Sequence, residues 1–169
     1  MDQQELFKFT APKARRRKKP PFEWKIVPFR ECARPYGTVV CECPEIAVQY
    51  WCLNVETAPH FNASCECFVV LILNTRKHIM GHQLVTIGLL DSLLVHAREA
   101  FRAAIIAAAH SVIFMHNHPS GDPAPSDADI RATRDLVRAG QLLRIEVTDH
   151  IIVGNGRHLS LREFGIIQP

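Results

Sequence analysis

An unbroken run of seven apolar residues, at positions 67–73, limits the folds that this chain can adopt. A strand with one face in water alternates apolar and polar residues, whereas a strand covered on both faces is apolar throughout. A shorter run, at 111–115, is also apolar after its first residue. The two runs therefore predict strands in the interior of a sheet that is covered on both sides.

The other elements follow from apolar periodicity and from the positions of proline and glycine. Helices are expected at 44–54, 97–109 and 126–139, and further strands at 79–87, 143–147, 150–153 and after a tight turn at 154–156. Gly140 is expected to end the third helix, because glycine is common just past a helix C-terminus. Strands and helices alternate from residue 66 onward, which predicts an α/β fold with a mixed central sheet flanked by helices.

The length of 169 residues suits one domain, and a hydrophobic content of 47% is enough to bury a sizeable core. We expect a basic flexible arm at 1–21, an irregular cysteine-containing lead-in at 22–43 and a folded domain at 44–169. No run of about 18 uncharged apolar residues occurs, so we expect no membrane span. The N-terminus does not resemble a secretory signal, so we expect a cytoplasmic protein whose six cysteines are reduced.

The positive charge of the chain is concentrated in the arm. Residues 1–20 hold seven lysines and arginines against two acids, a local net charge of +5, and because the overall charge is +3 the remaining residues carry −2. The centre of the arm contains Lys13, Arg15, Arg16, Arg17, Lys18 and Lys19. Such a cluster can bind nucleic-acid phosphates without sequence specificity, because it releases counterions. The same composition is typical of a solvated tail, and both interpretations stay open.

Two histidines and one aspartate are spaced for metal binding. His116 and His118 follow the run at 111–115, and in extended backbone residues two apart point to the same side. Ser126 stands where a helix N-cap is expected, and Asp129 follows three residues later, as in a capping box. Two imidazoles and one carboxylate leave a coordination position for water, which is the pattern of a catalytic zinc site.

These residues resemble a known family. His116-x-His118, seven intervening residues, Ser126 and then Asp129 match the JAMM motif, His-x-His-x(7)-Ser-x(2)-Asp, of the JAB/MPN metalloproteases. Within that superfamily the chain looks like the RadC branch over residues 44–164. The segments that carry this likeness are 95–99 (Val-His-Ala-Arg-Glu), 116–123 (His-Asn-His-Pro-Ser-Gly-Asp-Pro), 125–126, Asp129, Thr133, Leu136, 139–140 and 149–154 (Asp-His-Ile-Ile-Val-Gly).

The chain departs from the RadC branch in two respects. Ala97 stands where that branch usually has proline, a change that we expect to affect only a helix start. The basic arm and the cysteine-containing segment stand where the branch usually has a DNA-binding helical region. The second departure weakens the transfer of a DNA-repair role to this chain.

The resemblance implies a cytidine-deaminase-like JAB/MPN fold and a zinc metallohydrolase that acts on a peptide or an isopeptide. One Zn²⁺ per chain would be held by His116, His118 and Asp129, and it would activate a water and polarise a carbonyl. A function of a different class is favoured by the RadC likeness and the basic arm. It is that of a DNA-associated accessory protein in repair, recombination or mobile-element biology.

The resemblance also suggests which other residues take part in the chemistry. Glu66, just before the first apolar run, is the expected acid/base, and Glu99 is the alternative candidate. Ser126 would help to stabilise the developing oxyanion, besides capping its helix. Asp149 and His150 are either a pair that orients a metal ligand or polar residues at the entry of a strand.

The cysteines raise the question of a second zinc site. Cys41 and Cys43 form one Cys-x-Cys pair, and Cys65 and Cys67 form another. In a strand, each pair would present both thiols on one side. Zinc sites usually use wider spacings, however, and small cysteines buried in strands are more common. We therefore expect packing rather than a second metal.

Overall fold

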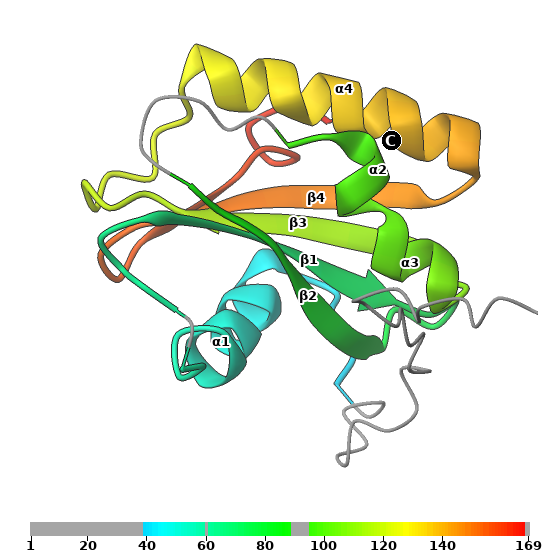
Figure 1. Cartoon of the computed structure of the whole chain (residues 1–169), viewed down its shortest axis with the longest axis horizontal. Helices are drawn as coiled ribbons and strands as arrows, with labels where there is room; N and C mark the ends of the chain where they lie inside the picture. Colours follow the sequence, from blue (N-terminus) through cyan, green and yellow to red (C-terminus); the bar gives the residue numbers. More distant parts are fainter. Residues whose placement is uncertain (1–38, 60, 89–94, 168–169) are drawn as a thin grey trace, which may run out of the picture.

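The structure is a computed structural model that describes residues 39–59, 61–88 and 95–167, so the predicted arm at 1–21 and most of the lead-in lie outside the described residues. Its centre is a five-stranded sheet with the strand order β2-β1-β3-β4-β5 (Figure 1). The strands are β1 (Glu66–Leu73), β2 (Ile79–Gly88), β3 (Ser111–Asn117), β4 (Glu146–Val153) and β5 (His158–Ser160). The helices are α1 (Pro44–Asn54), α2 (Ala97–Ala100), α3 (Arg102–Ile106) and α4 (Asp127–Leu143).

The sheet is mixed, as predicted. β1 pairs antiparallel with β2 and with β3, and β3 continues through α4 into β4, which lies parallel to it. β5 returns antiparallel to β4 after the predicted turn at 154–156. Every residue of β3 is buried, and so is every residue of β1 after the first. The two apolar runs are therefore interior strands, and the α/β fold is confirmed.

Two layers of side chains cover the two faces of the sheet, and Figure 1 shows α1 on one side with α2, α3 and α4 on the other. On the first side, Trp51 of α1 packs in one apolar cluster with Val69. On the second side, Phe68 packs in another cluster with Phe101 and with Leu136 of α4. Because successive residues of β1 point to opposite faces, this strand needs an apolar side chain at every position.

The prediction of a single helix at 97–109 is wrong in its extent. The segment forms two short helices, α2 and α3, which are separated at Phe101. Phe101 is fully buried, and its ring packs edge-on against Phe114 with 5.5 Å between the ring centroids. Ala108, just after α3, adopts a left-handed backbone with a φ of 49°. Neither position carries a proline or glycine, so tertiary packing rather than local propensity accounts for the break.

Gly140 does not end α4, which continues to Leu143. A Cβ atom at position 140 would lie 2.6 Å from the Ile145 carbonyl oxygen and 2.9 Å from Val147 Cγ2. The absence of a side chain therefore allows α4 to pack directly on the start of β4. The described helices, moreover, are each too short or too polar to cross a membrane.

The two strands predicted at 143–147 and 150–153 are one continuous strand, β4. Asp149 and His150 lie inside it and are both buried, so they are not at a strand entry. In the sequence, this polar pair interrupts an apolar run and therefore looks like a gap between two strands. Asp149 is hydrogen-bonded to Ser160 and His150 to Thr133, and these distant partners allow both polar side chains to be buried within one strand.

Candidate metal centre

The predicted metal ligands come together at the C-terminal end of β3. His116 lies on the strand, His118 lies just beyond it, and Asp129 lies in the first turn of α4. The Nε2 atoms of the two histidines are 3.0 Å apart, and oxygens of Asp129 lie 3.3 Å from His116 Nε2 and 3.4 Å from His118 Nε2. The ligand atoms of the group all lie within 4.8 Å of one another. Two nitrogens and one oxygen in this arrangement can hold a metal ion.

The cap of α4 fixes the Asp129 carboxylate. Ser126 Oγ accepts a hydrogen bond from the Asp129 N–H at 3.2 Å, and the Ser126 N–H donates to Asp129 Oδ2 at 2.8 Å. These two bonds form the predicted capping box. The Ser126 hydroxyl also donates to Oδ2, at 2.6 Å. Asp129 Oδ2 thus has two donors from Ser126, while Oδ1 faces His116.

The electrostatics of the group favour a bound cation. Asp129 is 3% exposed, and burial by itself would raise the pKa of its carboxyl. Interactions with the imidazoles of His116 and His118 and the hydrogen bond from Ser126 outweigh burial and hold that pKa well below its usual range. The interaction with Asp129 raises the pKa of His118, although burial opposes this. The carboxylate is therefore ionised at neutral pH and stabilises positive charge beside the imidazoles.

Glu66 lies on the same face of the sheet as the ligands. Phe68 is opposite His116 in the β1–β3 ladder, and their rings stack with centroids 6.1 Å apart. Glu66 precedes Phe68 by two residues and so points to the same face. Its charge also contributes to the raised pKa of His118, as a smaller cause than the hydrogen bond to Asp129. The predicted acid/base therefore lies beside the ligand group.

Asn117, between the two histidines, holds the backbone on either side of Glu66. Its Oδ1 accepts a hydrogen bond from the Cys67 N–H at 2.9 Å, and its Nδ2 donates to the Cys65 carbonyl at 3.0 Å. Asn117 was not among the predicted site residues. The available signal was a polar side chain at the one position of the His-x-His pattern that must point to the opposite face.

Glu99, the alternative acid/base, lies on α2. Its carboxylate pairs with Arg102 at 3.1 Å and with Arg98 at 3.6 Å, and its side chain is 42% exposed. Within the part of the chain that the structure describes, no hydrogen bond or ion pair joins Glu99 to the ligand group. The geometry therefore favours Glu66 over Glu99 for a role at the metal.

Asp149 and His150 point to opposite faces of β4, so only one of the pair contacts the ligand group. His150 Nε2 lies 2.9 Å from His116 Nδ1. Asp149 instead accepts hydrogen bonds from the Ser160 hydroxyl at 2.6 Å and from the Arg162 N–H at 3.1 Å. Asp149 thus fixes the turn after β5, and burial raises the pKa of its carboxyl.

The described cysteines are free thiols, and none belongs to a possible metal-binding group within the described ranges. Cys41 and Cys67 are buried, whereas Cys43 is exposed and Cys65 is partly exposed. Cys41 and Cys67 pack in the apolar cluster on the α1 side of the sheet. The expectation that cysteines pack in the core is thereby confirmed for these two residues.

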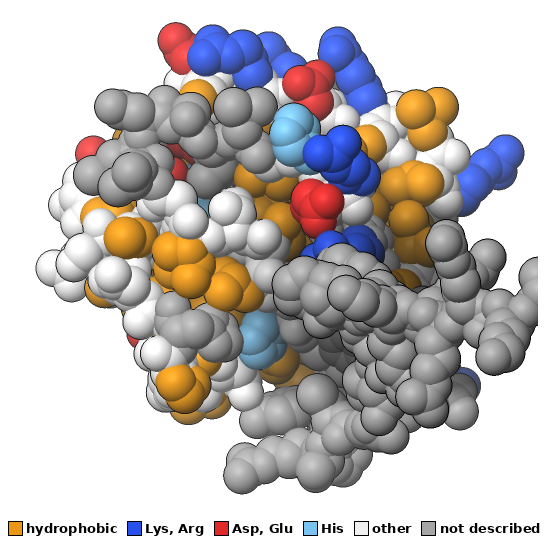
Figure 2. Space-filling model, viewed as in Figure 1, with side chains coloured by type: hydrophobic (Ala, Val, Ile, Leu, Met, Phe, Trp, Pro, Cys, Tyr) orange, Lys and Arg blue, Asp and Glu red, His pale blue; other side chains and the backbone are white. Residues whose placement is uncertain are grey.

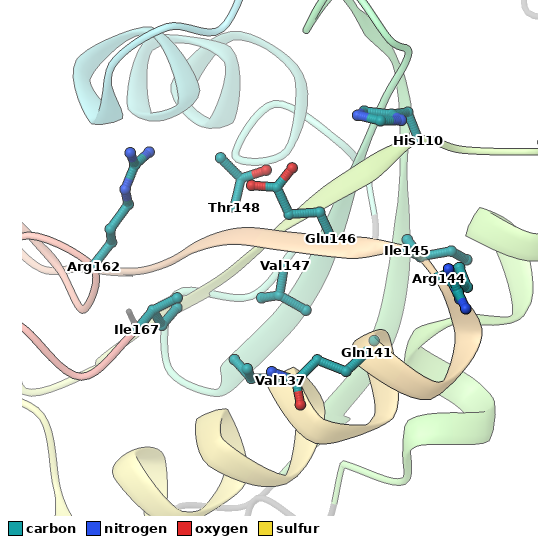
Figure 3. A pocket seen from close by; sticks show the side chains of 11 residues that line it. His110, Val137, Gln141, Arg144, Ile145, Glu146, Val147, Thr148, Arg162 and Ile167 are labelled. Atoms are coloured by element: carbon teal, nitrogen blue, oxygen red, sulfur yellow. The ribbon is translucent and has the colours of Figure 1, made fainter. Parts of the chain in front are cut away.

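Two cavities differ in their relation to the ligand group. A cleft of about 470 Å³ adjoins His118 and is lined by the loop 119–121, the turn 154–156, Glu56 and Phe61. A cavity of about 370 Å³ lies between the C-terminal half of α4 and the start of β4, as Figure 3 shows. Because the ligand Asp129 lies in the first turn of α4, the smaller cavity lies toward the other end of that helix. Of these two cavities only the cleft touches the ligand group, and it does so through His118.

The mixed sheet, the two histidines at the end of its central strand and the aspartate in the following helix together define a JAB-type domain. The family model of the RadC-like JAB domain matches residues 41–166, and the chain belongs to that family. The resemblance drawn from the motif is thereby confirmed.

Three similar proteins are each called a UPF0758 protein, a name that states no activity. One from Methanosarcina acetivorans is 47% identical over 103 residues, which are 61% of this chain and 45% of that protein. One from Desulfitobacterium hafniense is 49% identical over 102 residues, covering 60% and 45% respectively. One from Chlorobaculum parvum is 49% identical over 104 residues, covering 62% and 47%. The aligned part of this chain thus spans less than half the length of these relatives.

Proposed function

We propose that this protein is a zinc-dependent hydrolase of amide bonds, with a peptide or an isopeptide as its substrate. The observation that supports this most is the convergence of His116 Nε2, His118 Nε2 and Asp129 Oδ1 at the end of a buried strand. Structural zinc sites are usually closed by four protein ligands, often thiolates. In the described residues this group offers three ligands and no thiolate, so a position remains for water or substrate.

The residues around the ligands suit hydrolysis. When bound, a zinc ion lowers the pKa of a coordinated water and polarises a substrate carbonyl. In our proposal, Glu66 accepts the proton of the attacking water and passes it to the leaving nitrogen. Asn117 keeps the Glu66 backbone in place for this transfer. In this structure the Ser126 hydroxyl donates to Asp129 Oδ2, so a role at the substrate's carbonyl oxygen requires the hydroxyl to turn from Asp129 to that oxygen, where the N-terminus of α4 also favours negative charge.

The cleft beside His118 offers room for a substrate chain. Its volume of about 470 Å³ is within the usual range of ligand sites. Its lining includes Gly121, Gly154 and Gly156, which have no side chains and therefore present backbone to it. Exposed peptide groups can form hydrogen bonds with an extended substrate. A peptide that lies in this cleft would bring an amide bond close to His118.

The first test is the metal content of protein purified without added metal. We expect one zinc per chain in the wild type and loss of that zinc in His118→Ala, because the variant removes one of three ligands. The wild type is then assayed on peptide and isopeptide substrates. Glu66→Gln is expected to retain zinc and lose activity, whereas Glu99→Gln is expected to behave as wild type.

Three results would contradict the proposal. Full activity in Glu66→Gln would exclude Glu66 as the acid/base, and normal zinc content in His118→Ala would place the ion elsewhere. If the zinc-loaded wild type hydrolyses neither class of substrate, the amide-hydrolase function is wrong.

A nucleic-acid-associated role is the second candidate, and the distribution of basic residues favours it. Figure 2 shows basic side chains over α4, whose exposed arginines Arg131, Arg134 and Arg138 alternate with the exposed acids Asp127 and Asp135. The arm at 1–21 adds the basic cluster of the sequence. We expect DNA affinity to fall steeply with salt and to disappear when residues 1–21 are deleted. Unchanged binding after that deletion would rule out the arm as the contact.

A further inference from the structure

We propose that Thr133 and His150 are positioning residues that fix the tautomer of His116, so that its Nε2 lone pair faces the metal ion. The proposal depends on the proposed function only in taking His116 as a metal ligand. It is based on three consecutive hydrogen bonds. They link the backbone carbonyl of one ligand, Asp129, through Thr133 and His150 to the ring of another ligand, His116. Neither Thr133 nor His150 belongs to the ligand group itself.

The direction of each hydrogen bond follows from the first. Thr133 Oγ1 lies 2.6 Å from the Asp129 carbonyl oxygen, which can only accept, so the hydroxyl hydrogen is used there. The same Oγ1 lies 2.6 Å from His150 Nδ1 and must accept from it. His150 therefore carries its proton on Nδ1. In a neutral imidazole, this leaves Nε2 of His150 as an acceptor.

The hydrogen bond between His150 and His116 then fixes the tautomer of the ligand His116. His150 Nε2 lies 2.9 Å from His116 Nδ1, and because His150 Nε2 accepts, His116 Nδ1 must donate. A neutral His116 with a proton on Nδ1 has its lone pair on Nε2. That is the atom 3.3 Å from Asp129 Oδ1 and 3.0 Å from His118 Nε2. The ring of His116 is thus prepared to bind a metal through Nε2.

Burial makes this set of partners hard to replace. Thr133, His150 and His116 are each 0% exposed, so solvent does not reach their polar atoms. The rings of Phe68 and Phe114 pack edge-on against His150, with centroids 5.4 Å and 6.3 Å away.

His118 is held in the same tautomer, with its proton on Nδ1, but by a backbone carbonyl instead of side chains. Its Nδ1 lies 2.8 Å from the backbone carbonyl oxygen of Asp122, which can only accept, so Nδ1 carries the proton. Both histidines therefore direct the lone pairs of their Nε2 atoms at each other across 3.0 Å. Two lone pairs so close repel one another unless a cation lies between them. The arrangement thus fits a metal ion, with the backbone fixing one ligand and the Thr133–His150 pair fixing the other.

The test compares Thr133→Val, which removes the hydroxyl at nearly constant volume, with Thr133→Ser, which keeps it. Zinc affinity is measured by competition with a chelator, and urea unfolding of the metal-free proteins checks that each variant folds. We expect a 10–100-fold loss of zinc affinity in Thr133→Val, the range typical of residues that orient metal ligands. Thr133→Ser is expected to stay within a few-fold of wild type, which a role in packing alone would not explain.

A second measurement reads the tautomers directly. Long-range ¹H–¹⁵N NMR of the metal-free protein above pH 8 is expected to show the Nδ1–H form of His116 and His150 in the wild type and in Thr133→Ser. In Thr133→Val, His116 is expected to shift toward the Nε2–H form. Equal zinc affinity in all three folded proteins, or an Nε2–H form of His116 in the wild type, would overturn the proposal.

These readouts do not use enzymatic activity, so they separate the two proposals. A wild type that binds zinc and hydrolyses nothing would contradict the proposed function and leave the tautomer test intact. A wild type that hydrolyses its substrate while Thr133→Val binds zinc normally would contradict only the role of Thr133 and His150.

Discussion

Ser126 serves the fold and the candidate site at the same time. Its oxygen caps α4, and its hydroxyl hydrogen holds Oδ2 of Asp129. A polar residue at a helix start is therefore also what keeps a carboxylate directed at the two histidines. At the scale of single residues, stability and metal binding depend on the same bonds here.

Removing the Ser126 hydroxyl should thus weaken the fold even without metal. We expect Ser126→Ala to lower the free energy of unfolding by about 1 kcal/mol, because the cap of α4 is lost. Urea unfolding of the metal-free protein measures this change. Ser126→Thr keeps a hydroxyl and is the control, expected to stay closer to wild type. An unfolding curve of Ser126→Ala that overlays that of the wild type would contradict the role of the cap.

Cys41 offers a pH-dependent prediction at the same scale. Burial raises the pKa of its thiol to about 11, and Cys43, two residues later, is exposed. The thiolate is the reactive form, so alkylation of Cys41 should be slow near pH 8 and should accelerate as the pH rises toward 11. Mass spectrometry after brief treatment with iodoacetamide reports both sites. Equal labelling of Cys41 and Cys43 at pH 8 would contradict this prediction.

At the scale of elements, the contact between α4 and β4 determines how the site is assembled. The helix carries Asp129 at its start and Thr133 one turn later, and β4 carries His150. Gly140 allows the far end of the helix to approach the start of the strand. The distance between α4 and β4 near Gly140 therefore affects the hydrogen bonds to the ligands at the other end of the helix.

Gly140→Ala tests that spacing. In an exposed helix this change would stabilise by about 1 kcal/mol through helix propensity. Here the added methyl would meet the Ile145 backbone at 2.6 Å, and overpacking of this kind costs about 1–3 kcal/mol. We therefore expect a net loss of stability in thermal or urea unfolding. Gln141→Ala, at the neighbouring exposed position, is the matched control and should be nearly neutral.

The sequence predicted best where the signal was local. The strands at 67–73 and 111–115 and the ligand group were predictable, because apolar runs and the spacing from His116 to Asp129 depend on nearby residues. The break at Phe101 and the course of α4 past Gly140 depend on packing between distant elements. The hydrogen bond between His150 and His116 was also not predictable, since it requires the β3–β4 register, which shifts between Val112 and Ile113.

At the scale of the whole molecule, the ligand group lies at the end of a sheet that two apolar clusters hold on both faces. Neither cluster includes a residue of the segment 116–129, which contains all three ligands. The apolar core and the metal group are thus built from different residues, although the cap of α4 serves both the fold and the metal group. The ion should therefore add to a fold that already exists.

Zinc binding should nevertheless raise the melting temperature, because the ion binds the folded chain. At a free zinc concentration of 100 times Kd the gain is about 2.7 kcal/mol, which corresponds to roughly 5–10 °C for a chain of this size. Calorimetry with and without EDTA measures the shift. His118→Ala is expected to show almost none. A full shift in that variant would assign the stabilising ion to another location.

The position of all three ligands within residues 116–129 has a consequence for what happens when the ion leaves. A bound ion closes only a short loop, so the entropy gained on its release is small compared with that of a crosslink between distant segments. Zinc fingers, in contrast, lose their fold with their metal. In hydrogen-exchange terms, we expect the amides of β1 and β3 to stay protected in the metal-free chain, while those between His118 and Ser126 exchange faster. Removal and return of zinc would then switch the site off and on without a refolding step.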